Sequence, residues 1–276
     1  MKMSLLMQIP DAKISHNVVI EIGGLPIEVQ TTDAGFERIL KGRYGDYIRP
    51  GTSSKFALRV QLIVPDSFDP GADAEVWLED HEWKMRRGDF RASWNPMERR
   101  GVVFQTANPY AIDSVLRIVH TLMLAPEGGF LVHASSAVRN GKAFLFSGVS
   151  EAGKTTIARL APADVALLTD EVSYVRNVDG RYFAYGTPFA GELGEPGKNI
   201  SAPIERLYLL KKGPENKIEE MDRAVAIQCL LRNILFFAHQ SEMVRQVFEA
   251  ACAFAAAVPV YQLTFFPDQR IWELIG

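Results

Sequence analysis

The stretch AFLFSGVSEAGKTTIARL, residues 143–160, decides the fold of this chain. Residues 148–155 have the pattern G-x-x-x-x-G-K-[ST]. They lie between an apolar run that predicts a strand and the run TTIARLA, which is compatible with a helix. A strand, a glycine-rich loop and a helix in this order form a P-loop, whose backbone N–H groups surround a bound anion. The sequence therefore predicts a phosphate-binding loop.

The motif predicts different roles for its residues. Lys154 is expected to reach the β- and γ-phosphates of a nucleotide, and the Thr155 hydroxyl to bind Mg²⁺. Glu151 is unusual, because a carboxylate in an anion-binding loop is costly unless it points to solvent. The alternative interpretation is a glycine-rich turn without a ligand. The predicted nucleotide-binding residues are Gly148, Val149, Ser150, Glu151, Ala152, Gly153, Lys154, Thr155 and Thr156.

Strands are predicted on both sides of the loop. FLVHASSAV, residues 130–138, joins the strand at 143–146 through an Asn140-Gly141 turn, which is a strong hairpin signal. Downstream, VALL at 165–168 predicts a short strand that ends in Thr169, Asp170 and Glu171. VSYVR, residues 172–176, either continues that strand or forms the next one.

P-loop chemistry requires a carboxylate near the metal ion, and Asp170 and Glu171 follow the loop at a suitable distance. Neighbouring strand residues point to opposite faces of a sheet, so the two carboxylates are expected to have different roles. The alternative is an exposed acidic turn. His133 lies on the strand before the loop, where it is either a proton partner or phosphate contact, or a histidine bonded to a neighbouring carbonyl.

These segments together resemble the HPr kinase/phosphorylase family and its HPr-kinase-related branch. The resemblance covers residues 129–190 most strongly, and it depends on the His-bearing strand, the G-x-S-x-x-G-K-[ST] loop and the acidic pair. It implies the P-loop core shared with ATP-dependent phosphoenolpyruvate carboxykinases. The related branch includes kinases encoded beside ribosomally made peptides, some of which phosphorylate a seryl hydroxyl. The β-rich N-terminal region and the GTPF segment, residues 186–189, are similar to that branch.

The resemblance assigns catalytic roles to Asp170, Lys154 and His133. Asp170 matches the residue that acts as base or metal partner near the γ-phosphate, and Glu171 matches a second acidic position that is usually Asp. The implied metal ligands are Thr155, Asp170 and Glu171. Two features depart from the family: Glu151 replaces a usual glycine, and the glycine-rich signature of HPr kinases has its nearest counterpart in GELGEPGKN, residues 191–199.

A second group of residues has weaker signals. Glu192, Glu195 and Lys198 lie in the GELGEPGKN segment, and Thr187 is expected to shape the rim of the site. Arg206 and Arg232 could stabilise transferring phosphate, since arginine matches phosphate geometry, but a solvated position is the preferred interpretation of both.

The first hundred residues have a β-rich pattern. Residues 17–30 predict a hairpin with a Gly23-Gly24 turn, and residues 56–64, 74–78 and 101–105 predict further strands. Trp77, Trp83 and Trp94 are expected to pack its core. Beyond residue 108, the predicted helices are Tyr110–Leu124, Arg223–Ala238 and Ser241–Ala257, and the last predicted strand is Val260–Phe265.

Composition excludes several protein classes. Of the 276 residues, 47% are hydrophobic and 23% are charged, which excludes wholesale disorder and a collagen-like fibre. The net charge of −3 gives no electrostatic reason to expect nucleic acid as a partner, and no apolar window is long enough for a spanning helix. The N-terminal residues 1–13 do not have a signal-peptide pattern. Cys229 and Cys252 are expected to be buried free thiols, and a cytoplasmic location follows.

We therefore expect an α/β fold, with a β-rich N-terminal domain at residues 1–108. A P-loop domain of the HPr kinase/phosphoenolpyruvate carboxykinase type, with a mixed sheet and flanking helices, is expected at residues 109–276. The expected function is an Mg-ATP-dependent kinase acting on a hydroxyl, with serine of a peptide or protein as acceptor. ATP and Mg²⁺ are the expected cofactors, and a homo-oligomer is compatible with the resemblance. The alternatives are a non-catalytic nucleotide-binding regulatory module and a bifunctional kinase/phosphorylase that releases pyrophosphate.

Overall fold

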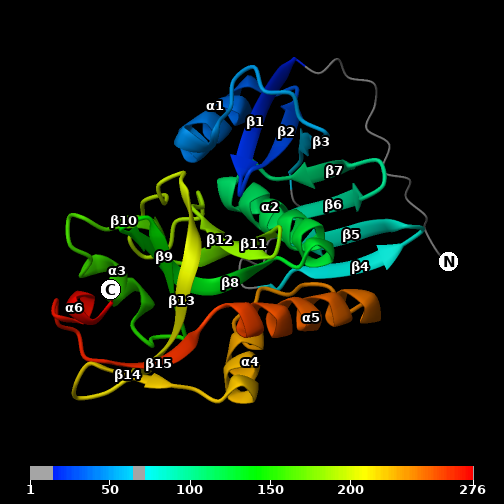
Figure 1. The fold of residues 1–276 in the computed structure, drawn as a ribbon. Helices are drawn as coiled ribbons and strands as arrows, with labels where there is room; N and C mark the ends of the chain where they lie inside the picture. The colour runs from blue at the N-terminus through cyan, green and yellow to red at the C-terminus, as the bar shows by residue number, and fades with distance from the viewer. Residues whose placement is uncertain (1–14, 65–71, 276) are drawn as a thin grey trace. The chain divides into compact units, whose positions relative to one another are not determined.

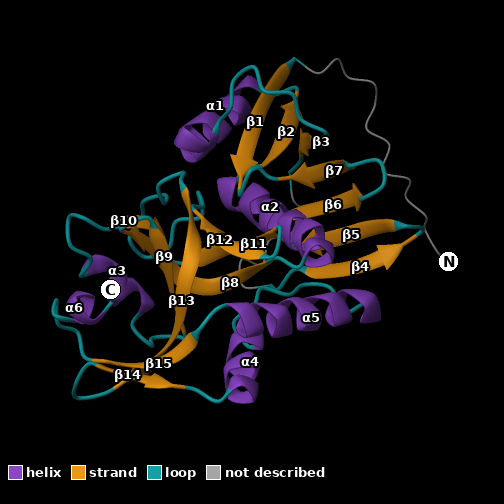
Figure 2. Ribbon diagram, viewed as in Figure 1, coloured by secondary structure: helices purple, strands orange, loops and turns teal. Residues whose placement is uncertain are grey.

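A computed structural model describes residues 15–64 and 72–275 and shows a mixed α/β chain in two compact units (Figure 1). Unit 1 contains the residues up to Val119 together with Phe237–Gln240, and unit 2 contains His120–Phe236 and Ser241 onward. Each unit is built on its own mixed sheet, with few helices (Figure 2). The segment 1–13, for which the sequence predicts no signal peptide, lies outside the described residues.

Unit 1 is a seven-stranded sheet in the order β1-β2-β3-β7-β6-β5-β4. Strand β3 is parallel to both of its neighbours, β2 and β7, and the remaining pairs are antiparallel. The predicted hairpin is confirmed, with β1 and β2 joined at Gly23-Gly24. The elements are β1 (His16–Ile22), β2 (Leu25–Thr31), α1 (Ala34–Tyr44), the 3-10 turn η1 (Gly45–Tyr47), β3 (Phe56–Leu62), β4 (Glu75–Glu79), β5 (Glu82–Arg87), β6 (Phe90–Asn95), β7 (Arg100–Gln105) and the start of α2 (Pro109–Leu124).

Helix α1 was not predicted, although the structure explains why it forms. Asp33 caps its N-terminus by accepting a hydrogen bond from the Phe36 N–H at 2.7 Å, and Phe36 and Leu40 bury their side chains. The buried carboxylate of Asp113 at the start of α2 accepts hydrogen bonds from the Tyr44 hydroxyl at 2.6 Å and from Arg43 Nε at 2.9 Å. These bonds fasten α1 to α2 within unit 1.

Unit 2 is an eight-stranded sheet in which β9, the strand before the phosphate-binding motif, lies between β8 and β13. Strand β9 is antiparallel to β8 and parallel to β13. The elements are η2 (Ala125–Glu127), β8 (Phe130–Arg139), β9 (Lys142–Ser147), α3 (Lys154–Arg159), β10 (Ala166–Thr169), β11 (Val172–Val178), β12 (Arg181–Tyr185), β13 (Ser201–Lys212), β14 (Lys217–Glu220), α4 (Arg223–Leu231), α5 (Ser241–Ala257), β15 (Val260–Phe265) and α6 (Ile271–Leu274).

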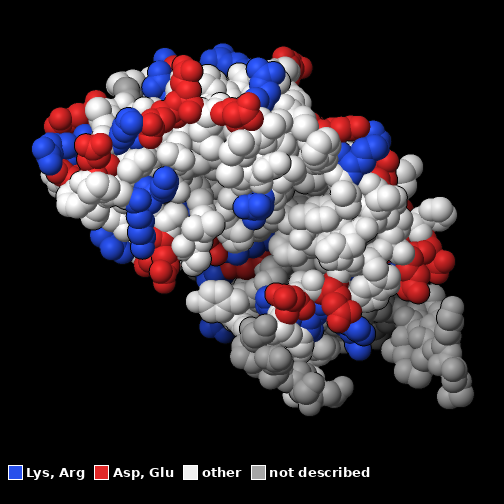
Figure 3. Space-filling view, turned by 90° about the horizontal axis from the view of Figure 1, so that it is seen from below, with Lys and Arg blue, Asp and Glu red and all other residues white. Residues whose placement is uncertain are grey.

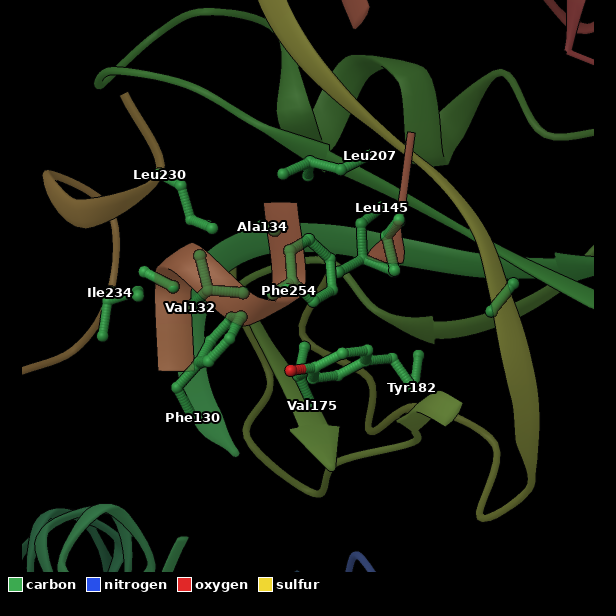
Figure 4. Close-up of a cluster of buried hydrophobic side chains, with 14 of the residues drawn as sticks. Phe130, Val132, Ala134, Leu145, Val175, Tyr182, Leu207, Leu230, Ile234 and Phe254 are labelled. Atoms are coloured by element: carbon green, nitrogen blue, oxygen red, sulfur yellow. The ribbon is translucent and has the colours of Figure 1, made fainter. Parts of the chain in front are cut away.

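One core cluster of unit 2 lies beneath helices α4 and α5 (Figure 4). Leu230 of α4 and Phe254 of α5 pack there against Val132 and Leu145 of the sheet. The Phe254 ring meets the rings of Phe130 and Tyr182 edge-on. Because these large side chains are almost fully buried, the cluster holds the helices firmly on the β8–β9 hairpin.

A second cluster supports the motif itself. Ile157 of α3 packs with Phe146 of β9 and Trp272 of α6, and all three side chains are buried. Trp272 Nε1 also donates a hydrogen bond to the Ile157 carbonyl at 3.1 Å. Since α3 has six residues, its position depends on this packing rather than on its own helix propensity.

Three sequence-based expectations are wrong in detail. The helix predicted at Arg223–Ala238 ends at Leu231, because residues 233–235 instead bond to the edge of β8. Trp77 is 38% exposed, whereas Trp83 and Trp94 are buried as expected. The two cysteines are free, but they are half-buried rather than buried.

Charged side chains of both signs are intermixed over the face drawn in Figure 3. Within the described residues, no helix combines the length and the apolar character that are needed to cross a bilayer.

A buried histidine makes the stability of unit 2 sensitive to acid. His120 of α2 is fully buried; its Nδ1 lies 2.9 Å from the Tyr174 hydroxyl, and its Nε2 has no partner among the described residues. Burial, with a smaller contribution from Arg176, lowers the pKa of His120 to about 3. In the unfolded chain the histidine pKa is about 6.5. Below that pH, His120 is therefore protonated in the unfolded chain but still neutral in the folded chain.

We expect the free energy of unfolding to fall by about 1.4 kcal/mol for each pH unit below 6.5, on account of this residue alone. Denaturant unfolding at pH 7, 6 and 5 measures the slope. His120→Phe should remove this part of the slope, and His81→Asn, in a turn of unit 1, should leave the slope as in the wild type. Equal slopes for wild type and His120→Phe would contradict the prediction.

Candidate active site

Strand register brings the predicted site residues together. Ala134 of β8 is paired with Ser147, so His133 lies beside the first residue of the loop, Gly148. Strands β10 and β11 both pair with β8, and Asp170 and Glu171 lie at the interruption between them. The Glu171 carbonyl accepts a hydrogen bond from the Ala134 N–H at 3.1 Å. The acidic pair and the loop therefore lie on opposite flanks of β8, close to the same point.

Two residues of the loop have a positive φ. Gly153 has φ +111°, and a Cβ atom there would lie 2.8 Å from the Phe265 ring. Glu151 also has a left-handed backbone, with φ +62°, and its side chain is exposed. A non-glycine residue adopts this conformation only at some cost, and the exposure keeps the Glu151 carboxylate in contact with solvent.

Lys154 lies within hydrogen-bond reach of its own loop. Its Nζ donates to the carbonyls of Gly148 at 3.0 Å and Val149 at 3.1 Å. Burial lowers the pKa of Lys154, and the neighbouring carboxylate of Glu192 acts in the opposite direction. The ammonium group is thus placed at the mouth of the loop, between two cavities.

The first cavity, here called the acidic cavity, has a volume of about 760 Å³. Its carboxylates are those of Glu151, Asp170, Glu171 and Glu192, and its cations are Lys154 and Lys212. Four carboxylates against two ammonium groups give it a negative balance, which favours a metal cation. His133, Ser150, Gly153, Thr155 and Thr156 also line this cavity.

The acidic pair has two distinct environments. Asp170 is 3% exposed, and its two oxygens accept hydrogen bonds from the Gly191 N–H at 2.9 Å and the Leu193 N–H at 2.8 Å. Glu171 is half-buried, and its N–H donates to the Thr169 hydroxyl at 3.2 Å. Asp170 therefore has a fixed orientation and also fastens the segment that carries Glu192.

The second cavity, here called the arginine cavity, has a volume of about 550 Å³. It shares His133, Ser150 and Lys154 with the acidic cavity, so the two meet at the loop. The remaining lining residues include Gly148, Val149, Leu209, Leu210, Arg232 and Asn233. No carboxylate lines it among the described residues, and Lys154 and Arg232 give it a positive balance.

Sequence reasoning placed most of these residues, but not all. Of the predicted loop residues, eight line a cavity, whereas Ala152 is buried in the core cluster below the loop. Lys212 and the lining role of Arg232 were missed, because both depend on strand pairing between distant segments. The only local signal for Lys212 was the end of an apolar run.

Several weaker candidates lie away from both cavities. Thr187 is fully buried and donates its hydroxyl proton to the Val172 carbonyl. Arg206 lies over the Tyr261 ring and donates to the Tyr208 hydroxyl. Of the three candidates in segment 191–199, Glu192 lines a cavity, whereas Glu195 and Lys198 do not.

Within the described residues, no group of three or more His, Cys, Asp or Glu side chains is placed to hold a metal ion by itself. Proteins commonly hold Mg²⁺ through one or two carboxylates together with substrate phosphates and water. Thr155, Asp170 and Glu171 all line the acidic cavity and could supply such ligands.

Comparison with known proteins identifies a family. The family model described as "SynChlorMet cassette protein ScmC" matches residues 105–276, and it is not a model of HPr kinases. No curated protein matches the chain. Among solved structures, the Hpr(Ser) kinase/phosphatase from Coxiella burnetii is 13% identical, with a TM-score of 0.31, over 52% of this chain and 85% of that one. The family match contains every residue that lines either cavity.

Proposed function

The chain belongs to the SynChlorMet cassette protein ScmC family, and we propose that it is an Mg-ATP-dependent kinase. It would transfer the γ-phosphoryl group to a hydroxyl, with a serine of a peptide or protein as acceptor. One observation carries the proposal: Lys154 and Thr155 of a P-loop motif line the same cavity as Asp170 and Glu171. These are the residue types that phosphoryl transfer requires around a nucleotide and its metal ion.

The loop would hold the triphosphate. Backbone N–H groups of the loop would bind its oxygens, and Lys154 would contact the β- and γ-phosphates. Thr155 and one carboxylate of the acidic pair would hold Mg²⁺, which would supply positive charge against the charge that develops on the phosphoryl oxygens. Lys212, at the end of the strand parallel to β9, adds a second positive charge on the same side.

The transfer forms a bond between the acceptor oxygen and the γ-phosphorus and breaks the bond from that phosphorus to the β–γ bridging oxygen, so that ADP leaves. The acceptor proton passes to the Asp170 carboxylate. Two backbone N–H donors orient that carboxylate, so little reorganisation is needed when the acceptor arrives. His133, exposed at the junction of the cavities, can contact the transferring group.

The proposal is tested by calorimetric titration of wild-type protein with Mg-ATP, followed by incubation with γ-labelled ATP and serine-containing peptides. We expect binding and labelled peptide. Glu171→Gln should still bind nucleotide but should need more Mg²⁺ and transfer label at least about 10-fold more slowly, and Glu220→Gln, on β14, is the matched control. Asp170→Asn is less suitable, since its amide would face two backbone N–H donors.

No binding at millimolar Mg-ATP would refute the proposal. Binding without transfer to any hydroxyl would instead favour a non-catalytic nucleotide-binding module, which the exposed carboxylate of Glu151 in the loop is compatible with.

A further inference from the structure

The two cavities beside the loop have opposite charge. The acidic cavity is lined by four carboxylates and two ammonium groups, whereas the arginine cavity is lined by Lys154, Arg232 and, among the described residues, no carboxylate. A metal ion is therefore favoured on one side of Lys154 and an anionic group on the other. A kinase binds two substrates that meet at the transferring phosphoryl group, and two adjoining cavities can hold one substrate each.

The loop residues show which end of the nucleotide faces which cavity. Thr155 and Thr156 line only the acidic cavity, and Gly148 and Val149 line only the arginine cavity. In a P-loop the backbone after the lysine holds the α- and β-phosphates, and the lysine reaches toward the γ-phosphate. The nucleoside would therefore extend into the acidic cavity, and the γ-phosphate would lie beside Lys154, which lines both cavities.

Arg232 is held in place by the segment that follows it. The Asn233 carbonyl accepts a hydrogen bond from the His133 N–H at 2.7 Å, and the Leu235 N–H donates to the Leu131 carbonyl at 2.8 Å. The Asn233 side chain donates to the Cys229 carbonyl at 2.7 Å, which closes the end of α4. These bonds fix the backbone at Arg232 against β8, next to His133.

The guanidinium of Arg232 is free to bind a ligand. Within residues 15–64 and 72–275, no carboxylate lies within ion-pair distance of it, although most other arginines of unit 2 contact an acid, a carbonyl or a ring. It is half-buried, and the cavity that it lines also contains the apolar residues Val149, Leu209 and Leu210. A guanidinium in such a setting matches a carboxylate through two parallel hydrogen bonds.

We propose that the arginine cavity binds the residues that flank the phosphoryl acceptor, with the reacting serine at the junction of the two cavities, where its hydroxyl can face Asp170, and that Arg232 selects acceptors with an Asp or Glu side chain beside that serine. That the bound peptide is phosphorylated rests on the proposed kinase function. The binding of an acidic peptide to this cavity does not depend on it. A cavity volume of about 550 Å³ is in the usual range for sites that enclose a small ligand or a few side chains. Lys154 and Arg232 together would repel an acceptor with basic neighbours.

Two seven-residue peptides test the proposal: Gly-Gly-Asp-Ser-Asp-Gly-Gly and its neutral counterpart with Asn in place of Asp. With γ-labelled ATP, wild type should favour the acidic peptide at least about 10-fold in kcat/KM, mainly through KM. Arg232→Gln should remove this preference, and Arg232→Glu should transfer it to a peptide with Lys in place of Asp. Arg38→Gln, on α1, is the control for loss of one positive charge, and its preference should equal that of wild type.

Direct binding separates this inference from the proposed function. Peptide affinity is measured without nucleotide, and Mg-ATP affinity is measured without peptide. If the acidic peptide binds and Arg232→Gln lowers its affinity, the proposed peptide site is supported even where no label is transferred. Equal affinities for the two peptides, a preference that survives in Arg232→Gln, or a large loss of Mg-ATP affinity in that variant would each overturn the inference. The last result would place the nucleotide in the arginine cavity.

Discussion

Lys154→Ala is expected to lower the affinity for Mg-ATP by about 100-fold. The ammonium group would make charge-assisted contacts to two phosphates, and each such contact contributes about 1.5–3 kcal/mol, so that a total near 3 kcal/mol is lost. The same variant should transfer label more slowly still, because charge on the γ-phosphoryl oxygens increases in the transition state. Calorimetric titration measures the first effect, and label transfer at saturating nucleotide measures the second.

Lys142→Ala is the matched control for this experiment. Lys142 lies on the strand before the loop but pairs with Glu205 at the surface, and it lines neither cavity. Its removal should leave the Mg-ATP affinity within about twofold of wild type. If Lys154→Ala bound Mg-ATP as tightly as Lys142→Ala, the loop would not be the nucleotide site.

Gly197→Ala is expected to destabilise the protein by about 3 kcal/mol or more, as severe overpacking does. A Cβ atom at residue 197 would lie 1.6 Å from the Leu168 carbonyl oxygen, which belongs to the backbone of β10 and cannot move aside alone. The Gly197 N–H also donates to the Thr187 carbonyl at 3.0 Å, so the segment cannot shift without losing a bond. The melting temperature should fall by roughly 2–4 °C for each kcal/mol.

Gly42→Ala is the control, because it lies in α1 and a Cβ there would meet no atom within 4 Å. This substitution should be neutral or stabilise by up to about 1 kcal/mol, since alanine favours a helix. Equal melting temperatures for the two variants would show that Gly197 does not lie against the Leu168 carbonyl of β10. Loss of site geometry should accompany the loss of stability, because this segment carries Glu192 and both donors to Asp170.

Local sequence signals were sufficient to predict the elements that are determined by residues close together in the chain. The hairpins at Gly23-Gly24 and Asn140-Gly141 are turns with left-handed residues. The alternating flanks of the first and the apolar runs beside the second gave correct strands. The helix at 241–257 was correct for the same reason, since its apolar stripe repeats every 3.6 residues. The loop motif likewise depends on consecutive residues.

Non-local pairing was beyond the reach of these signals. Residues 232–238 have a helix-compatible pattern, yet 233–235 bond to β8, and this pairing puts Arg232 in a cavity wall. The parallel pairing of β13 with β9 similarly brings Lys212 to the loop from more than 50 residues away in sequence. The hydrogen bonds from Gly191 and Leu193 to Asp170 could not be predicted, because the donors are backbone N–H groups, which every residue except proline has.

The resting position of Lys154 has a consequence for ligand discrimination. Two of the three N–H donors of its ammonium are already used by the carbonyls of Gly148 and Val149, so an incoming anion can accept one hydrogen bond directly and must displace a carbonyl to accept a second. For a nucleotide bound as proposed, the many contacts of a triphosphate outweigh that cost. A lone inorganic phosphate or sulfate makes few contacts, and their binding free energy would exceed only slightly the free energy lost with the Lys154–carbonyl hydrogen bonds. The loop would thus bind the triphosphate selectively, and abundant small anions would compete with it poorly.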